Sequence, residues 1–198
     1  MTSRSAILGA LRARPKAPSP APLPDLSEPF CTYSDPLQHF AAVLGSVGGK
    51  VVLAPTLEAA EMALNAEPAY QQARQVCGLV AGLGRSNVDL TTVSDPHSLE
   101  TVDFAIARGR LAVAENGAVW VRESDVPTRA LLFITQHLAL VVGKNTLVNN
   151  MHEAYAQLEL GSAEFGVFIS GPSKTADIEQ SLVIGAHGAR SLLVFVIG

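Results

Sequence analysis

Several short runs of consecutive apolar residues constrain this chain most strongly. Runs such as KVVLA, GVFI and LLVFVI contain no alternating polar positions, which is typical of strands buried on both faces. They alternate with segments of helical periodicity, so we predict an α/β fold: a single-domain, largely parallel open sheet with helices on both faces. Strands are expected at Lys50–Ala54, Val76–Val80, Val88–Thr92, Leu111–Ala114, Ala118–Val121, Leu138–Val142, Gly166–Ile169 and Leu192–Ile197.

Helix signals lie between these runs. Asp35 before Pro36 supplies a capping carboxylate and a first-turn proline, and the helix that they open ends at a glycine pair. Thr56 caps a second helix. The apolar segment Ala130–Ile134 is ambiguous. Further helices are expected over Ser5–Arg12, Asp95–Arg108, Asn149–Leu160 and Ser173–Leu182.

The N-terminal part differs from the rest in its proline content. Five prolines lie between Pro15 and Pro24, and proline lacks the amide donor that helices and central strands require. We interpret Arg14–Pro29 as an extended segment, either solvated or packed on a partner subunit. The expected division is a flexible proline-rich arm over 1–34 and one domain over 35–198.

Charge and cysteine content exclude several function classes. The net charge of −4 and the lack of a basic stripe argue against nucleic acid and anionic membranes as partners. Two cysteines, Cys31 and Cys77, are too few for an iron–sulfur cluster held by this chain alone, and the scattered histidines predict no metal site. With no signal peptide and no apolar stretch of membrane-spanning length, the expected location is the cytoplasm.

The loop Ser170–Glu179 is the first candidate site. Gly171 allows a ligand to approach the backbone, and Ser173 or Thr175 can cap the helix that we expect to follow. Amides at a helix N-terminus together with the Lys174 ammonium suit a small carboxylate or phosphate. We therefore predict a small-anion site at Ser170, Gly171, Ser173, Lys174, Thr175 and Asp177. An ordinary capped helix is the alternative.

Glu115 and His187 are the candidate catalytic residues. Glu115 precedes Asn116-Gly117, a tight-turn signal between two apolar runs, and its carboxylate could act as nucleophile or base. His187 lies between small residues before the last strand and can titrate near neutral pH. Such loops are expected beyond the carboxyl ends of the parallel strands, where α/β folds bind their ligands.

The segment SGPSKTADIEQSLVIGAHG, from Ser170 to Gly188, resembles the C-terminal signature of the LUD-domain family. Thr101–Val121 and Pro127–Val142 are similar to further stretches of that family, so that the resemblance covers roughly Asp35 to the end. Two positions depart from it: Ala189 stands where the family usually has proline, and Asn116 where threonine is more common.

The resemblance implies a fold of the NagB/RpiA/CoA-transferase-like group. It also implies a subunit of a three-component system that oxidises L-lactate to pyruvate, with iron–sulfur clusters on partner subunits and no cofactor in this chain. Such a subunit would bind a small anion, organise the complex or contribute to catalysis.

The alternative implied by the same superfamily is a stand-alone enzyme. Family-I CoA-transferases carry a catalytic glutamate in a similar turn, so that Glu115 would attack an acyl-CoA and form a glutamyl-CoA thioester. A phosphosugar-handling enzyme would use Glu115 with Lys174 or His187. A purely structural subunit is the third hypothesis.

Overall fold

The computed structural model describes residues 3–13, 30–158, 165–175, 183–185 and 188–198. The predicted extended segment Arg14–Pro29 and the residues Asp177, Glu179 and His187 lie outside the described residues. Helix α1 (Ser3–Arg12) forms close to the predicted range, and none of its residues is buried. None of the described helices is long and apolar enough to cross a bilayer.

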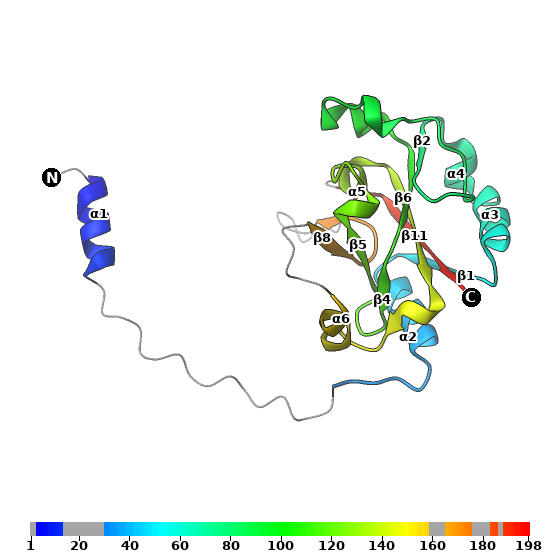
Figure 1. The fold of residues 1–198 in the computed structure, drawn as a ribbon, viewed down its shortest axis with the longest axis horizontal. Helices are drawn as coiled ribbons and strands as arrows, with labels where there is room; N and C mark the ends of the chain where they lie inside the picture. The colour runs from blue at the N-terminus through cyan, green and yellow to red at the C-terminus, as the bar shows by residue number, and fades with distance from the viewer. Residues whose placement is uncertain (1–2, 14–29, 159–164, 176–182, 186–187) are drawn as a thin grey trace.

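Five parallel strands form the central sheet, in the order β1-β11-β6-β3-β2 (Figure 1). The strands span Lys50–Ala54 (β1), Val76–Gly78 (β2), Phe104–Arg108 (β3), His137–Gly143 (β6) and Ser191–Ile197 (β11). The last strand in sequence thus pairs with the first, with Lys50 opposite Leu193. The sheet confirms the predicted fold class.

The two faces of this sheet carry separate apolar clusters, because successive side chains of a strand point to opposite sides. On one face, Phe104 and Phe195 pack with helices α3 (Leu57–Asn65) and α4 (Pro68–Gln72). On the other face, the cluster includes residues of α2 (Pro36–Ser46), whose N-terminus is capped by Asp35 as predicted. Helices therefore lie on both faces.

A second sheet, which we did not predict from the sequence, packs on the same face as α2. Its order is β7-β4-β5-β8, and β4 and β5 form the predicted antiparallel hairpin. The strands span Leu111–Val113 (β4), Ala118–Arg122 (β5), Leu147–Val148 (β7) and Gly166–Ile169 (β8). Helix α6 (Met151–Gln157) covers the outer side of this sheet through a smaller apolar cluster.

The predicted helix over Asp95–Arg108 is wrong in its second half. A 3₁₀ turn spans Pro96–Thr101, and Phe104–Arg108 is the strand β3. The Asp103 carboxylate accepts hydrogen bonds from the amides of Arg74 and Gln75 at 2.7 and 2.8 Å, which fixes the entry to the strand. Four consecutive buried residues fit a buried strand as well as a helix, so periodicity alone could not decide.

Two further segments differ from their predictions. The predicted strand Val88–Thr92 contains the 3₁₀ turn Leu90–Thr92, because the Asp89 carboxylate accepts the amide hydrogen of Thr91. The predicted helix Ser173–Leu182 instead begins with strand β9 (Lys174–Thr175), which pairs antiparallel with β10 (Val183–Ile184). The apolar segment Ala130–Ile134, which the sequence leaves ambiguous, contains the short helix α5 (Leu131–Ile134). Further 3₁₀ turns span Glu123–Asp125 and Lys144–Thr146.

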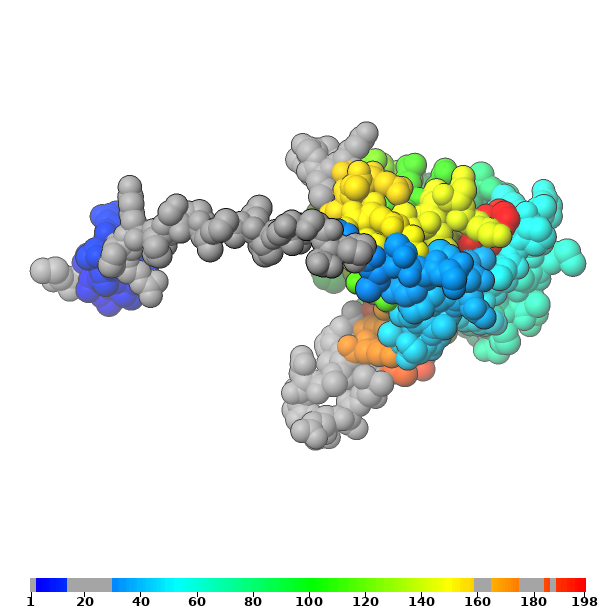
Figure 2. Space-filling model, turned by 90° about the horizontal axis from the view of Figure 1, so that it is seen from below, coloured from blue at the N-terminus to red at the C-terminus, as the bar shows by residue number. Residues whose placement is uncertain are grey.

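The carboxyl ends of the five parallel strands meet at one edge of the central sheet. Figure 2 shows the side of the molecule where they lie: the red end of β11 is next to the yellow region that includes the end of β6 and the cyan region of β1 and α3. The amino ends lie at the opposite edge, where the His137 ring nitrogen Nδ1 lies 2.7 Å from the Ser191 hydroxyl oxygen.

His137 makes stability depend on pH in a defined window. Burial, followed by the charge of Arg190, lowers the pKa of this imidazole below its usual value near 6.5. Below about pH 6.5 the unfolded chain therefore takes up a proton that the folded chain does not, so stability is lost as the pH falls. In urea unfolding at pH 7.5 and 5.5, the wild type should lose more stability than His137→Gln. Equal losses in both proteins would contradict this assignment.

Candidate ligand-binding site

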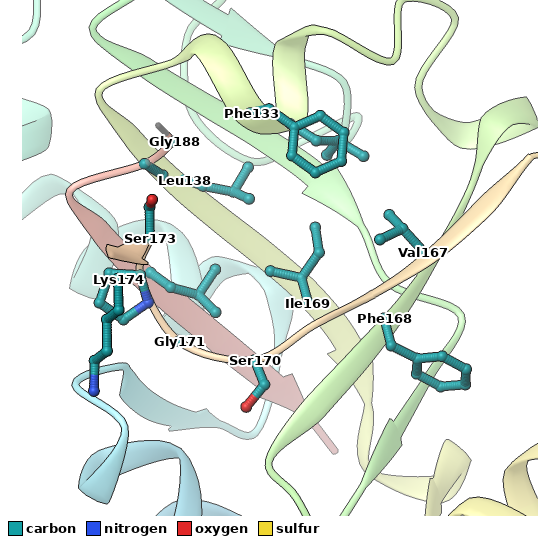
Figure 3. A pocket seen from close by; sticks show the side chains of 14 residues that line it. Phe133, Leu138, Val167, Phe168, Ile169, Ser170, Gly171, Ser173, Lys174 and Gly188 are labelled. Atoms are coloured by element: carbon teal, nitrogen blue, oxygen red, sulfur yellow. The ribbon is translucent and has the colours of Figure 1, made fainter. Parts of the chain in front are cut away.

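A cavity of about 310 Å³ lies between the two sheets, at the amino ends of β6 and β11 (Figure 3). Its walls come from α5, β6, β8, β11, the loop that follows β8, and the residues before β11. The lining residues are Leu132, Phe133, Leu138, Val167, Phe168, Ile169, Ser170, Gly171, Pro172, Ser173, Lys174, Gly188, Ala189 and Leu192. The volume is at the lower end of the range for small-molecule sites, about 300–1,000 Å³.

The walls are mostly apolar, and the polar groups gather on one side. In Figure 3 the side chains of Phe133, Leu138 and Ile169 point into the space, and the Ser173 hydroxyl lies near Gly188. Among the residues that the structure describes, no acidic side chain lines the cavity. Such a space suits a small molecule with an apolar part and one polar or anionic group.

Four of the predicted anion-binding residues line this cavity. The Ser170 hydroxyl donates a hydrogen bond to the Asn116 carbonyl at 2.7 Å, so it is already engaged. Gly171 has φ 75°, and a Cβ there would lie 2.8 Å from the Val47 carbonyl oxygen, so glycine is required at this close approach. Ser173 and Lys174 follow at the same wall.

The chain beyond Gly171 does not open a helix. The Ser173 amide donates to the Ala189 carbonyl at 2.8 Å, and the Ser173 carbonyl accepts from the Gly185 amide at 2.9 Å. The predicted helix N-terminus with its free amides is therefore not formed at Ser173–Thr175, where Lys174 and Thr175 belong to a strand. Thr175 lies in strand β9. Lys174 is exposed, and its ammonium group points away from the cavity in Figure 3.

Glu115 has a structural partner in the fold. Its carboxylate accepts the amide hydrogen of Met151 at 2.9 Å, at the start of α6, and its own amide donates to the Asn149 carbonyl. It does not line the cavity and is not brought together there with Lys174. The second catalytic candidate, His187, is outside the described residues, although its chain neighbour Gly188 lines the cavity.

The position of the cavity differs from the prediction that ligand-binding loops lie at the carboxyl ends of the parallel strands. The loop Ser170–Lys174 follows β8, which belongs to the second sheet, and it lies near the amino ends of β6 and β11. Sequence reasoning also missed the apolar walls from α5 and from the start of β6. Their only signal was the apolar character of Ala130–Ile134, which gave no indication of a cavity.

The LUD domain model matches residues 86–197. Lactate utilization protein C of Geobacillus thermodenitrificans strain NG80-2 is 31% identical over 161 residues, which cover 76% of this chain and 63% of that protein. Lactate utilization protein C of Geobacillus kaustophilus strain HTA426 is 33% identical over 121 residues, or 58% and 47% of the two chains. This chain thus spans about half to two thirds of the length of these relatives.

A solved structure shows the same fold. The crystal structure of a DUF162 family protein from Deinococcus radiodurans superposes with a TM-score of 0.58 and 20% sequence identity. The superposition covers 82% of this chain and 96% of that chain.

Proposed function

Because this chain belongs to the LUD domain family, we propose that it acts in lactate utilisation, as a subunit of a system that oxidises L-lactate to pyruvate. The relatives named lactate utilization protein C support this role. The cavity beside Ser173 and Lys174 is the observation that carries the proposal for a bound ligand.

The chemistry of this cavity fits a small 2-hydroxy or 2-oxo acid. The methyl group of lactate or pyruvate would contact the apolar walls around Phe133 and Ile169, where its burial is favourable. The carboxylate would face Ser173 and Lys174, the side of the cavity that holds hydrogen-bond donors. No ion pair joins the Lys174 ammonium group to a described residue, so its long side chain is free to rotate toward the opening.

The electrons of lactate oxidation require an acceptor on another subunit. Conversion of L-lactate to pyruvate releases two electrons and two protons, and a cluster that receives them usually needs four thiolates. This sequence has two cysteines, and burial raises the pKa of Cys77 to about 11, so its thiol keeps its proton. We therefore assign the iron–sulfur clusters to partner subunits. Co-purification of the tagged chain with cysteine-rich partners supports this assignment, and a chain recovered without such partners from lactate-grown cells argues against it.

Lys174→Ala is expected to weaken L-lactate or pyruvate binding by about tenfold or more, because a hydrogen bond to a charged group contributes about 1.5–3 kcal/mol. Isothermal titration of the purified chain measures this effect. Lys50→Ala is the matched control, since it removes another exposed lysine that does not line the cavity. Equal affinities for wild type and Lys174→Ala would remove Lys174 from the site. A wild type that binds neither acid would contradict ligand binding by the isolated subunit.

A further inference from the structure

A second cavity, of about 360 Å³, lies at the carboxyl edge of the central sheet. We propose that it binds the phosphate group of a small phosphorylated molecule, at a site separate from the cavity at the amino edge. Its lining residues are Val80, Arg108, Gly109, Arg110, Val141, Val142, Gly143, Asn145, Thr146 and Ile197. A neighbouring depression shares Asn145 and Ile197 and adds Lys144 and Gly198.

The topology explains why a hollow forms at this edge. After β1 the chain turns to the face covered by α3, whereas after β3 and β6 it turns to the face covered by the second sheet. Because β1 and β6 lie on either side of β11, connections that leave them toward opposite faces leave a crevice at the carboxyl ends of these strands. The strand that separates β1 from β6 is β11, and its Ile197 lines both hollows.

The charge at this edge is positive and only partly neutralised. Arg110 forms a bidentate ion pair with Asp125, with both N–O distances at 2.6 Å. Arg108 is exposed at the end of β3, and no ion pair joins it to any residue in the described part of the chain. Lys144 is likewise exposed and has no ion-pair partner there. In the part of the chain that the structure describes, no acidic side chain lines either hollow.

Arg108 and Lys144 lie at the carboxyl ends of two neighbouring strands. Arg108 ends β3, directly opposite Val141 of β6, and Lys144 follows the end of β6. Adjacent strands are about 4.8 Å apart, so the long Arg and Lys side chains can reach a common anion. Two unneutralised positive charges match a phosphate dianion better than a carboxylate, which carries a single charge. The planar guanidinium of Arg108 can donate two parallel hydrogen bonds to phosphate oxygens.

The floor of the site is suited to the rest of the ligand. Val80, Val141 and Ile197 supply apolar surface beside the charged groups. Gly143 leaves room for the Asn145 amide, because a Cβ at Gly143 would lie 2.6 Å from the Asn145 side-chain oxygen. The site thus combines apolar walls, an amide and two cations, which favours an apolar or aromatic molecule that carries a phosphate group.

Phenyl phosphate is the probe that tests both the two cations and the apolar floor of the site. Titration into the full chain at fixed ionic strength should show binding that Arg108→Ala weakens by about 10- to 100-fold and Lys144→Ala weakens to a smaller extent. Arg108→Lys should recover part of the loss, because it restores the charge without the bidentate geometry. Benzoate should bind more weakly than phenyl phosphate because it carries one charge, and inorganic phosphate should bind more weakly because it lacks the ring.

Lys174→Ala is the control at the amino-edge cavity and should leave phenyl phosphate binding unchanged. Thermal unfolding of each variant identifies loss of fold, which these exposed positions should not cause. The proposal is overturned if phenyl phosphate fails to bind at millimolar concentration, if benzoate binds as tightly, or if Arg108→Ala and Lys174→Ala weaken it equally. Because lactate binding is tested through Lys174, the failure of either site leaves the other assignment standing.

Discussion

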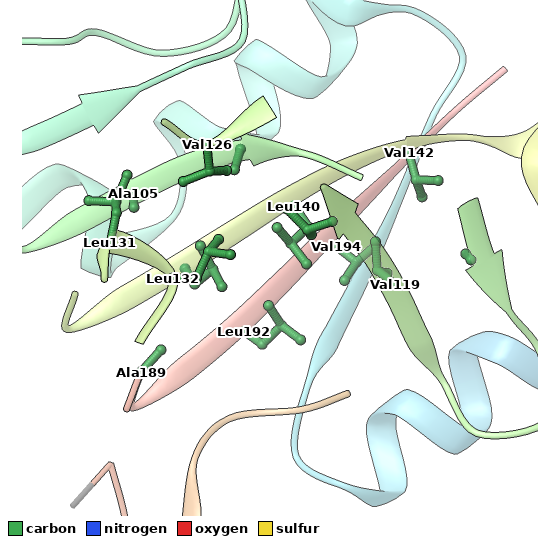
Figure 4. Packing of buried hydrophobic residues seen from close by; sticks show 14 of the residues in the cluster. Ala105, Val119, Val126, Leu131, Leu132, Leu140, Val142, Ala189, Leu192 and Val194 are labelled. Carbon is green, nitrogen blue, oxygen red and sulfur yellow. The ribbon is translucent and has the colours of Figure 1, made fainter. Parts of the chain in front are cut away.

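Replacing Leu140 with alanine is expected to lower the free energy of unfolding by roughly 3–5 kcal/mol. Leu140 lies in β6, the middle strand of the central sheet, and its side chain is fully buried between the two sheets. Figure 4 shows it beside Val194 and Val119, which come from β11 and β5. Truncation removes apolar contacts and leaves a cavity, because packed strands on both sides prevent collapse.

Leu53→Ala is the matched control for this prediction. Leu53 belongs to the same sheet, in the edge strand β1, but 59% of its surface is exposed. The same chemical change there should cost less than about 1 kcal/mol, because few contacts are lost. Urea unfolding followed by circular dichroism measures both variants. Similar losses in the free energy of unfolding for Leu140→Ala and Leu53→Ala would contradict a close-packed apolar layer between the two sheets.

Gly117→Ala is expected to destabilise the protein by about 3 kcal/mol or more, from two separate causes. Gly117 has φ 65°, a left-handed conformation that costs an alanine roughly 1–2 kcal/mol. An added Cβ would also lie 2.9 Å from the backbone nitrogen of Leu44 in α2, and backbone atoms cannot move aside cheaply. The hairpin turn would have to shift relative to α2, and with it the Asn116 carbonyl that holds Ser170.

Gly45→Ala is the control for Gly117→Ala. It tests whether any glycine-to-alanine substitution destabilises the protein. Gly45 lies inside α2, and a Cβ there meets nothing within 4 Å. Alanine is a better helix former than glycine by roughly 0.5–1 kcal/mol, so this variant should be as stable as the wild type or more stable. Thermal unfolding of the two variants should therefore shift in opposite directions. A shift of the same sign and size in both would contradict the close approach of turn and helix.

The features that the sequence predicts correctly are those with a local cause. The apolar runs at β1, β6, β8 and β11 form strands, and Asn116-Gly117 forms the hairpin turn. Asp35 and Thr56 cap α2 and α3, because their side-chain oxygens accept hydrogen bonds from the amides three residues later. Each of these depends on neighbouring residues, which a sequence displays directly.

The features that the sequence does not predict depend on distant partners. Ser173 followed by Lys174 and Thr175 has the composition of a helix start, but pairing with Val183–Ile184 makes the segment a strand. The apolar walls of the amino-edge cavity come from four separate segments, so no single motif predicts them. The sequence pattern predicts Arg108 as the last residue of a helix. As the last residue of β3, it instead lines the carboxyl-edge cavity.

The place of β11 in the sheet has a consequence for how the protein is made. The strand is the last in sequence, yet it lies between β1 and β6 and pairs with both. At about 5–20 residues per second, the ribosome needs on the order of ten seconds to reach it after completing β1. Throughout that time β1 lacks its neighbour, and β6 lacks the same neighbour from its own completion onward. Such long-range pairing is slow to form. Nascent chains should therefore expose unpaired apolar strand edges and bind chaperones until residues 191–197 emerge.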